Sequence, residues 1–221
     1  MNIVKVNLES PEEEIVHQIV EALWAGQVVA MPFDTSYGLA ADAANTEAVE
    51  RLFLIKGKRE GVPISIVVRD YAMLEEVAEV PNEELRKFLL KYFPGKVTVV
   101  LNFKLQTSNF KQTSKNKSKI SKQLMGKDGT IGIRIPNYRL TNAVAWAFQK
   151  AFTSTSANIS GSSPCFSAEE IVKQFEGREF QPDLIVDGGE LPKSDVSTVV
   201  DATVWPPLIL RQGEVEIAEA E

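Results

Sequence analysis

Residues 27–39, QVVAMPFDTSYGL, join an apolar stretch directly to a polar turn. Gln27–Met31 is rich in β-branched and apolar residues, and Pro32 ends it, so we predict a short buried strand there. The segment Pro32–Leu39 that follows contains three hydroxyl side chains and a glycine. Ligands of α/β proteins bind where strands end, although a turn of this composition is also common without any ligand.

The segments on either side alternate between helical and strand patterns. Ser10-Pro11-Glu12-Glu13 has the composition of a capping box, and apolar residues at helical spacing follow as far as Gly26. We predict further helices at 46–56, 71–78, 82–92, 140–150 and 168–175, and strands at 64–68, 97–101, 130–135, 151–153, 184–186, 198–202 and 208–210. This alternation predicts an α/β fold: a twisted, mixed, open sheet with flanking helices, in a single domain spanning residues 1–221.

The composition excludes several kinds of protein and of site. The chain has 221 residues, of which 44% are hydrophobic and 24% charged, and no apolar run approaches the length needed to cross a bilayer. No secretory signal is visible, so we expect a cytoplasmic protein. Cys165 is the single cysteine and His17 the single histidine, and His17 is expected on a polar helix face. A metal site built from His or Cys is therefore excluded, and no residue is assigned as a general acid or base.

Positive charge is concentrated in one stretch of the chain. The net charge is −6, yet Lys104–Lys127 contains seven lysines and no acidic residue. The stretch lacks sustained periodicity, so residues 104–128 are predicted to form a long mobile loop. Two interpretations stay open: a solvated insertion, or a flap that attracts phosphates or RNA by its charge.

Three further segments have polar side chains where strands or helices should end. Lys56-Gly57-Lys58-Arg59 places three cations at a helix end, where they also complement the helix dipole. Ser154–Ser163 contains six hydroxyl side chains and an amide within ten residues, a density of small donors suited to phosphate oxygens. Ser197–Asp201 is followed by Leu210-Arg211-Gln212-Gly213. Neither GxxxxGK[ST] nor GxGxxG occurs, so the common nucleotide-binding motifs are not supported.

The order of these segments is more specific than any one of them. PFDTSYGL (32–39), IKGKR (55–59), GIRIP (132–136), STSANISG (154–161), STVVD (197–201) and LRQG (210–213) follow one another along the chain. This order resembles the YrdC family, the L-threonylcarbamoyladenylate synthases, whose pattern is PT[DE]TVYGL, KGRP, GxRxP, SAN-SG, STVVD and LRPG. The likeness runs from about residue 10 to residue 213, and the chain resembles the short, single-domain, TsaC-like members of the family.

The resemblance implies an ATP-dependent nucleotidyltransferase reaction. L-threonine, bicarbonate and ATP, with Mg²⁺ accompanying the ATP, would give threonylcarbamoyl-AMP and pyrophosphate. The product would serve a TsaD-type transferase complex that modifies tRNA next to the anticodon. Two alternatives remain: a non-catalytic YrdC-like module that binds tRNA or double-stranded RNA, and carbamoyl-adenylate chemistry of the HypF type. HypF-like proteins carry zinc-finger-like regions, which one cysteine cannot supply.

The resemblance also implies roles for individual residues. The threonine substrate is expected at Thr35, Arg134, Ser154 and Ser197, where the guanidinium of Arg134 suits a carboxylate. ATP is expected at Lys56, Lys58, Arg59, Thr130, Ser156, Asn158, Ser163 and Arg211. The sequence departs from the pattern at Phe33, where the family has threonine, and at Lys58-Arg59, where it has Arg-Pro, so either of those two cations is a candidate for the phosphates.

Overall fold

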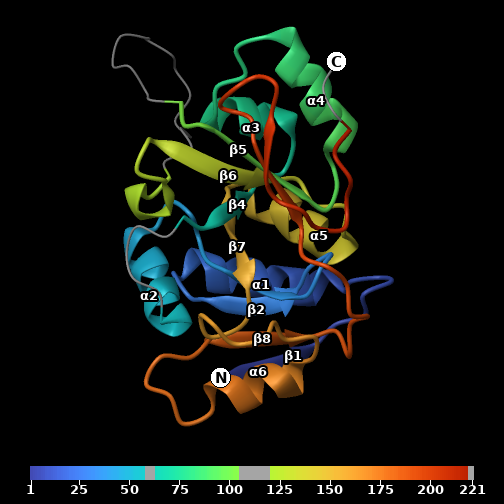
Figure 1. Ribbon diagram of the computed structural model, residues 1–221. Helices are drawn as coiled ribbons and strands as arrows, with labels where there is room; N and C mark the ends of the chain where they lie inside the picture. The colour runs from blue at the N-terminus through green and yellow to red at the C-terminus, as the bar shows by residue number, and fades with distance from the viewer. Residues whose placement is uncertain (58–62, 105–119, 219–221) are drawn as a thin grey trace.

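The protein is described from a computed structural model, in which residues 1–57, 63–104 and 120–218 are placed (Figure 1). Ten strands form one sheet in the order β1-β8-β2-β3-β7-β4-β6-β5-β9-β10. The strands are β1 (Asn2–Lys5), β2 (Val29–Pro32), β3 (Tyr37–Ala40), β4 (Ser65–Val67), β5 (Val97–Asn102), β6 (Thr130–Arg134), β7 (Phe152–Ser156), β8 (Leu184–Asp187), β9 (Thr198–Asp201) and β10 (Leu208–Arg211).

The sheet is mixed, as predicted. The pairs β1–β8, β2–β8, β4–β6 and β5–β9 are parallel, whereas β2–β3, β3–β7, β4–β7, β5–β6 and β9–β10 are antiparallel. The strands change direction strongly from one end of the sheet to the other, so that β2 and β8 cross the view of Figure 1 while β7 and β4 run nearly upright in it. The described chain therefore has the twisted, mixed, open sheet that the alternating pattern predicted.

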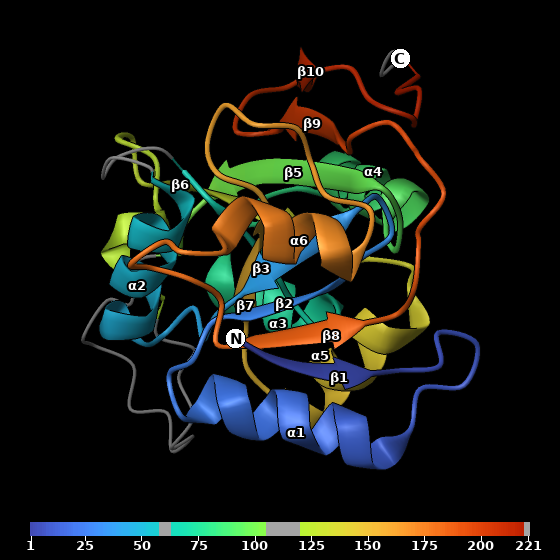
Figure 2. The same ribbon diagram turned by 90° about the horizontal axis from the view of Figure 1, so that it is seen from below.

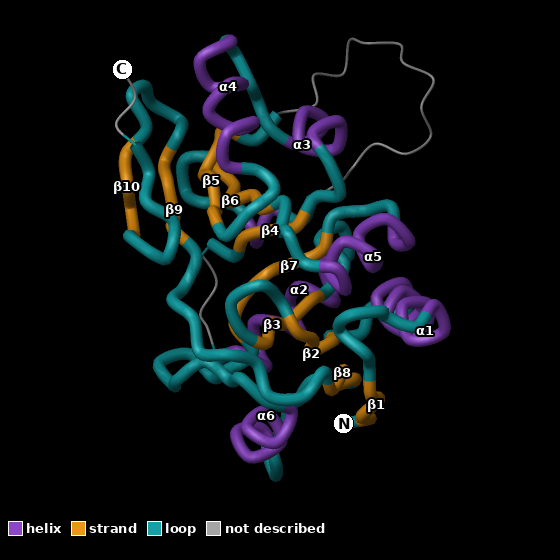
Figure 3. The backbone as a smooth tube through the Cα atoms, turned by 90° about the vertical axis from the view of Figure 1, so that its right-hand side faces the viewer, coloured by secondary structure: helices purple, strands orange, loops and turns teal. Residues whose placement is uncertain are grey.

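Helices cover both faces of the sheet (Figures 2 and 3). The apolar sides of α1 (Glu13–Trp24) and α5 (Arg139–Phe148) belong to one hydrophobic cluster, which includes Val29 and Met31 of β2. The second and larger cluster includes Val28 and Ala30, and it is covered by α2 (Thr46–Lys56), α3 (Tyr71–Val77), α4 (Glu83–Tyr92) and α6 (Ala168–Phe175). Consecutive residues of a strand point to opposite faces, so the continuous apolar run 28–31 supplies both clusters.

Side-chain caps fix where four of the helices begin. Asn45, Asp70, Asn82 and Ser167 each accept a hydrogen bond from a backbone N–H in the first turn of α2, α3, α4 and α6. The predicted capping box at Ser10 is wrong. Helix α1 begins at Glu13 with Glu12 as its N-cap, and the carboxylate of Glu12 instead accepts from the backbone N–H of Asn7 at 3.0 Å.

Two strands and one short helix were not expected from the sequence. Strands β1 and β3 are each four residues long, and β7 extends to Ser156, three residues beyond the predicted end at 153. Of the predicted mobile loop 104–128, residues 105–119 lie outside the described chain. The prediction is wrong for its C-terminal part, where Ile120 and Leu124 are buried in the larger cluster and Lys122–Leu124 forms the 3₁₀-helix η1.

The prediction that residues 1–221 form a single domain stays a prediction. Among the helices of the described residues, none combines the length and the apolar composition needed to span a bilayer.

Candidate functional site

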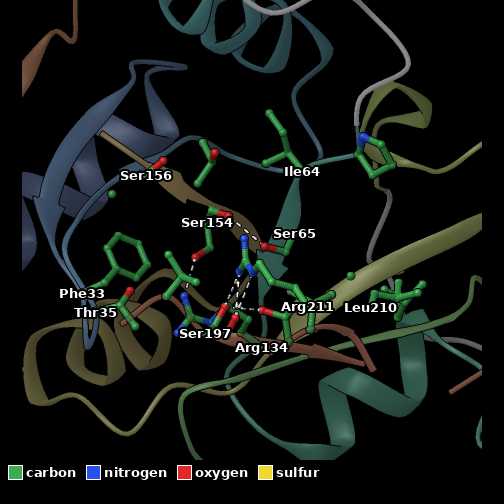
Figure 4. Close-up of a pocket in the computed structure, with 18 of the residues that line it drawn as sticks. Phe33, Thr35, Ile64, Ser65, Arg134, Ser154, Ser156, Ser197, Leu210 and Arg211 are labelled. Atoms are coloured by element: carbon green, nitrogen blue, oxygen red, sulfur yellow. Dashed lines mark hydrogen bonds between the residues drawn. The ribbon is translucent and has the colours of Figure 1, made fainter. Parts of the chain in front are cut away.

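A cavity of about 740 Å³ opens at the centre of the sheet, between its two differently oriented parts (Figure 4). Its walls come from β3, β7, β4, β6, β5, β9 and β10 and from the turn between β2 and β3. Most of the polar lining residues carry hydroxyl groups, and the cations that line it within the described chain are Lys56, Arg134 and Arg211. Segments that lie up to 178 residues apart in the sequence, from Phe33 to Arg211, are thereby brought around one space.

The cavity collects most of the residues singled out from the sequence. The predicted site residues that line it are Thr35, Lys56, Thr130, Arg134, Ser154, Ser156, Asn158, Ser197 and Arg211. Ser163 does not line it: this residue is exposed, and its carbonyl accepts from Nε2 of Gln174 at 3.0 Å. Lys58 and Arg59 lie outside the described residues. The ligand expected at each residue stays a prediction.

Arg134 lies at the end of β6 with its guanidinium buried. Its Nη2 donates to Oδ1 of Asp34 at 2.6 Å, and the two side chains are only 7% and 3% exposed. Its Nη1 lies 3.4 Å from Oγ of Ser154 on β7, which is separated from β6 by β4 in the sheet. Both Nε of Arg134 and Oδ2 of Asp34 are buried without a hydrogen-bond partner. The carboxylate therefore compensates one edge of the guanidinium and leaves some of its donors unused.

Arg211, at the end of β10, is the second guanidinium of the cavity. Its Nη2 donates to the carbonyl of Ser197 at 2.8 Å and to Oγ of the same residue at 3.1 Å. Oγ of Ser197 also lies 3.1 Å from Oγ1 of Thr98 on β5, which orients the serine hydroxyl. Burial, and next the charge of Arg134, lower the pKa of Arg211. Two guanidinium groups that repel one another inside a cavity favour an anion placed between them.

Lys56, the last residue of α2, is 2% exposed and reaches across to the turn after β7. Its ammonium donates to the carbonyl of Ser156 at 2.6 Å and to Oδ1 of Asn158 at 2.9 Å. Oγ of Ser156 donates to the same Asn158 oxygen at 2.5 Å. The described contacts of Lys56 thus hold the Ser156–Asn158 turn against the helix end, in addition to placing a positive charge at the cavity wall.

The turn between β2 and β3 is held in place by the segment that leads from β8 to β9. Oγ of Ser194 donates to the carbonyl of Thr35 at 2.9 Å. The hydroxyl of Tyr37 donates to the carbonyl of Gly189 at 2.8 Å and accepts from the N–H of Gly188 at 3.0 Å. Burial raises the pKa of Tyr37 to about 12, so this hydroxyl stays protonated and keeps its donor role. The contacts fix Thr35 at the cavity mouth.

Several site residues were missed by the sequence reasoning. Ser65, Thr98 and Asn102 line the cavity from strands, where an isolated polar residue has no distinguishing local pattern. Oγ of Ser65 donates to the carbonyl of Ser154 at 2.8 Å and so joins β4 to the cavity wall. Asp34 was also missed, although it lies inside the segment 32–39. The signal that could have identified it was a charged residue beside hydroxyl residues in that segment.

Within the described residues, the site has neither a reactive cysteine nor a dedicated metal cage. Burial raises the pKa of the Cys165 thiol to about 12, which removes its nucleophilic form at neutral pH. Among the described residues there is no group of three or more His, Cys, Asp or Glu side chains that would hold a metal ion. Asp128, Asp201 and Asn102 do supply oxygen atoms along the cavity wall. These donors fit a hydrated Mg²⁺ that enters with phosphate groups, because such an ion needs only one or two protein ligands.

The fold and the cavity define an α/β protein whose cavity gathers three cations among hydroxyl side chains, and comparison with known proteins gives the family. The family model Sua5_yciO_yrdC, described as "Telomere recombination", matches residues 21–213. The chain belongs to this Sua5/YciO/YrdC family.

Individual relatives agree in sequence and in structure. The chain is 31% identical over 196 residues to a threonylcarbamoyl-AMP synthase of Pyrococcus abyssi, covering 89% of this chain and 53% of that protein. It is 29% identical to a threonylcarbamoyl-AMP synthase of Serratia proteamaculans, covering 87% of this chain and 96% of the relative.

Two solved structures match the whole fold. P. abyssi Sua5 complexed with L-threonine superposes with a TM-score of 0.83 at 30% identity, over 96% of this chain and 58% of that one. E. coli YciO superposes with a TM-score of 0.81 at 26% identity, over 96% of each chain. The chain thus spans little more than half the length of the Pyrococcus protein and nearly the full length of YciO.

Proposed function

We propose that the protein is an L-threonylcarbamoyladenylate synthase, which forms threonylcarbamoyl-AMP and pyrophosphate from L-threonine, bicarbonate and ATP. The observation that carries the proposal is the gathering of Arg134, Arg211 and Lys56 with hydroxyl side chains around one cavity. The names of the relatives at about 30% identity support it. The threonine bound in the Sua5 structure, whose fold this chain shares, supports the amino-acid substrate.

The chemistry of this reaction suits the residues of the cavity. The threonine amine forms an N–C bond with CO₂ derived from bicarbonate and releases a proton, giving an N-carboxylate. An oxygen of that carboxylate then attacks the α-phosphorus of ATP, and the bond to pyrophosphate breaks. Both steps accumulate negative charge on oxygen, and their main requirements are alignment of the reactants and compensation of that charge.

The two guanidinium groups divide these tasks. A bidentate guanidinium suits a planar carboxylate, so Arg134 is assigned to threonine and Arg211 to the phosphate oxygens of ATP. Ser154 and Ser197 hydrogen-bond the two guanidinium groups and stand beside the threonine, while Ser156, Asn158 and Thr130 stand beside the nucleotide. Asp128, Asp201 and Asn102 are the oxygen donors available to hold Mg²⁺, which would neutralise further charge on the phosphates when bound.

The wider role rests on the resemblance and on the names of the relatives. The product would be consumed by a TsaD-type transferase complex acting on tRNA in the cytoplasm. The alternative, a module that binds double-stranded RNA without catalysis, depends on the lysine-rich stretch, most of which lies outside the described residues.

Pyrophosphate release from ATP tests the proposal. The purified protein is incubated with ATP, Mg²⁺ and bicarbonate, with and without L-threonine, and the adenylate product is identified by mass spectrometry. We expect release that depends on threonine and bicarbonate and that falls when D-threonine replaces the L-enantiomer. Absence of threonine-dependent release at millimolar substrates contradicts the proposal. Tight binding of duplex RNA with a steep salt dependence and no ATP turnover would favour the RNA-binding module instead.

A further inference from the structure

Asp34 lies beside the cavity without forming part of its wall. Its neighbours Phe33, Thr35 and Ser36 in the turn between β2 and β3 line the cavity, whereas Asp34 does not. Its side chain is 3% exposed and is directed at Arg134. Asp34 therefore has no direct access to a ligand, and any effect that it has on one passes through the guanidinium.

The charge of Arg134 makes this carboxylate necessary. A buried guanidinium needs a compensating charge, and within the described chain Arg134 forms its ion pair with Asp34. The neighbouring charge on the cavity side is Arg211, whose pKa is lowered first by burial and next by the charge of Arg134. Loss of Asp34 would leave two guanidinium groups that repel one another, with Arg134 keeping only its 3.4 Å contact with Ser154 among its hydrogen bonds within the described chain.

The contacts also define an orientation for the guanidinium. Oδ1 of Asp34, in the turn between β2 and β3, accepts from Nη2 of Arg134 at 2.6 Å. Oγ of Ser154, on β7, lies 3.4 Å from Nη1. Two contacts to different nitrogens set the plane of the group. The 2.6 Å contact is the shorter and the charged one, so it dominates. A structural ion pair would satisfy all its atoms, but Oδ2 of Asp34 and Nε of Arg134 are both buried without partners.

From this geometry we infer that Asp34 is a positioning residue: it sets the plane of the Arg134 guanidinium so that the donors left over meet the carboxylate of the amino-acid substrate. The inference rests on the proposed function for the identity of that substrate. It assigns to Asp34 a role in threonine affinity and none in direct contact with threonine or ATP.

Two substitutions separate position from charge. Asp34→Glu keeps the negative charge but lengthens the side chain by one methylene, whereas Asp34→Asn keeps the shape and removes the charge. Asp183→Asn is the matched control, because the Arg51–Asp183 pair has the same 2.6 Å contact and neither residue lines the cavity. Threonine binding is measured by calorimetry without ATP, and KM and kcat are measured for threonine and for ATP.

We expect both Asp34 variants to bind threonine at least tenfold more weakly and to raise its KM, with the KM for ATP changed less than twofold. The control should bind threonine as the unmodified protein does. Combining Asp34→Asn with Arg134→Ala should cost no more than Arg134→Ala alone, because Asp34 acts through Arg134. Unchanged threonine affinity in Asp34→Glu would overturn the inference in favour of a purely electrostatic role. Losses that add in the double variant would overturn it in favour of direct contact.

A spectroscopic readout keeps the inference separate from the proposed function. In ¹⁵N-labelled protein the guanidinium resonances of Arg134, assigned by comparison with Arg134→Lys, should show slow rotation that becomes fast in both Asp34 variants. If the unmodified protein neither binds threonine nor releases pyrophosphate, the proposed function fails, and the positioning role is judged on these resonances. Unchanged rotation in the folded Asp34→Glu variant, or in Asp34→Asn, refutes the positioning role directly.

Discussion

Replacing Lys56 by methionine tests whether the cavity depends on a buried ammonium. Methionine has a similar length and is apolar, so the change removes the charge while keeping most of the packing. In the folded protein the ammonium of Lys56 is 2% exposed and donates to the carbonyl of Ser156 and to Oδ1 of Asn158. The substitution leaves both oxygens without this donor.

The expected magnitude follows from those two acceptors. Each buried acceptor left without its partner costs about 1–3 kcal/mol. Part of this cost is offset because the variant no longer buries an ammonium, which is itself unfavourable. We therefore expect Lys56→Met to lower the free energy of unfolding by about 2–4 kcal/mol. For a chain of this size the change corresponds to a melting temperature lower by roughly 5–15 °C.

Urea denaturation at neutral pH, followed by circular dichroism, and differential scanning calorimetry measure the change. Lys96→Met is the matched control, since Lys96 makes a 2.6 Å ion pair with Glu214 in which both side chains are partly exposed. Such a pair contributes about 0–1 kcal/mol. If Lys56→Met unfolds at the same urea concentration as Lys96→Met, the ammonium does not hold the Ser156–Asn158 turn, and our account of the cavity wall is wrong.

Further predictions concern other parts of the site. Arg134→Ala should raise the KM for threonine at least tenfold more than the KM for ATP in steady-state assays, and equal losses would contradict its assignment to the carboxylate. Ser163→Ala should leave both KM values unchanged, because this exposed residue does not line the cavity. Burial raises the pKa of Tyr37 from 10.0 to about 12. The contribution of the protonated hydroxyl to stability is therefore complete below pH 10 and is lost as the pH rises toward 12. Over this range the urea midpoint of Tyr37→Phe should fall less steeply than that of the unmodified protein. Neutralising five lysines of the lysine-rich stretch should preserve folding and weaken the binding of ATP or RNA mainly at low salt. Activity that is unchanged at every ionic strength would identify the stretch as a solvated insertion. The five residues are Lys111, Lys115, Lys117, Lys119 and Lys122.

The sequence predicted the fold well wherever a periodic pattern was long. Helices at 46–56 and 168–175 begin and end at the predicted residues, because an amphipathic pattern there coincides with a capping side chain. Strands β1 and β3 were missed although β8, β9 and β10, which are also four residues long, were predicted. β3 follows the polar turn so closely that its apolar residues were assigned to the turn. Pairing with neighbouring strands, which is a property of the tertiary structure, defines both.

The sequence predicted which residues form the candidate site better than it predicted the contacts between them. Ordered motifs identified Arg134, Ser156 and Arg211, and all three line the cavity. The hydroxyls of 154–163 are alike in sequence, yet the turn that follows Asn158 directs Ser163 to solvent. The pairing of Asp34 with Arg134, 100 residues further along the chain, had no local sequence signal. Such contacts depend on how strands from the two parts of the sheet meet.

The charge distribution reconciles the acidic composition of the chain with the anionic substrates that we propose for it. The net charge of the chain is −6, but the described cavity wall carries three cations against the two carboxylates of Asp128 and Asp201. Lys56 and Arg134 are buried, whereas Arg211 is exposed, and buried charges are screened by salt much less than exposed lysines are. Affinity for the substrates should therefore survive physiological salt if it comes from the cavity, whereas any contribution of the lysine-rich stretch should disappear. Measuring KM for ATP at low and at physiological ionic strength separates the two sources, and a KM that rises steeply with salt would show that the cavity cations do not dominate binding.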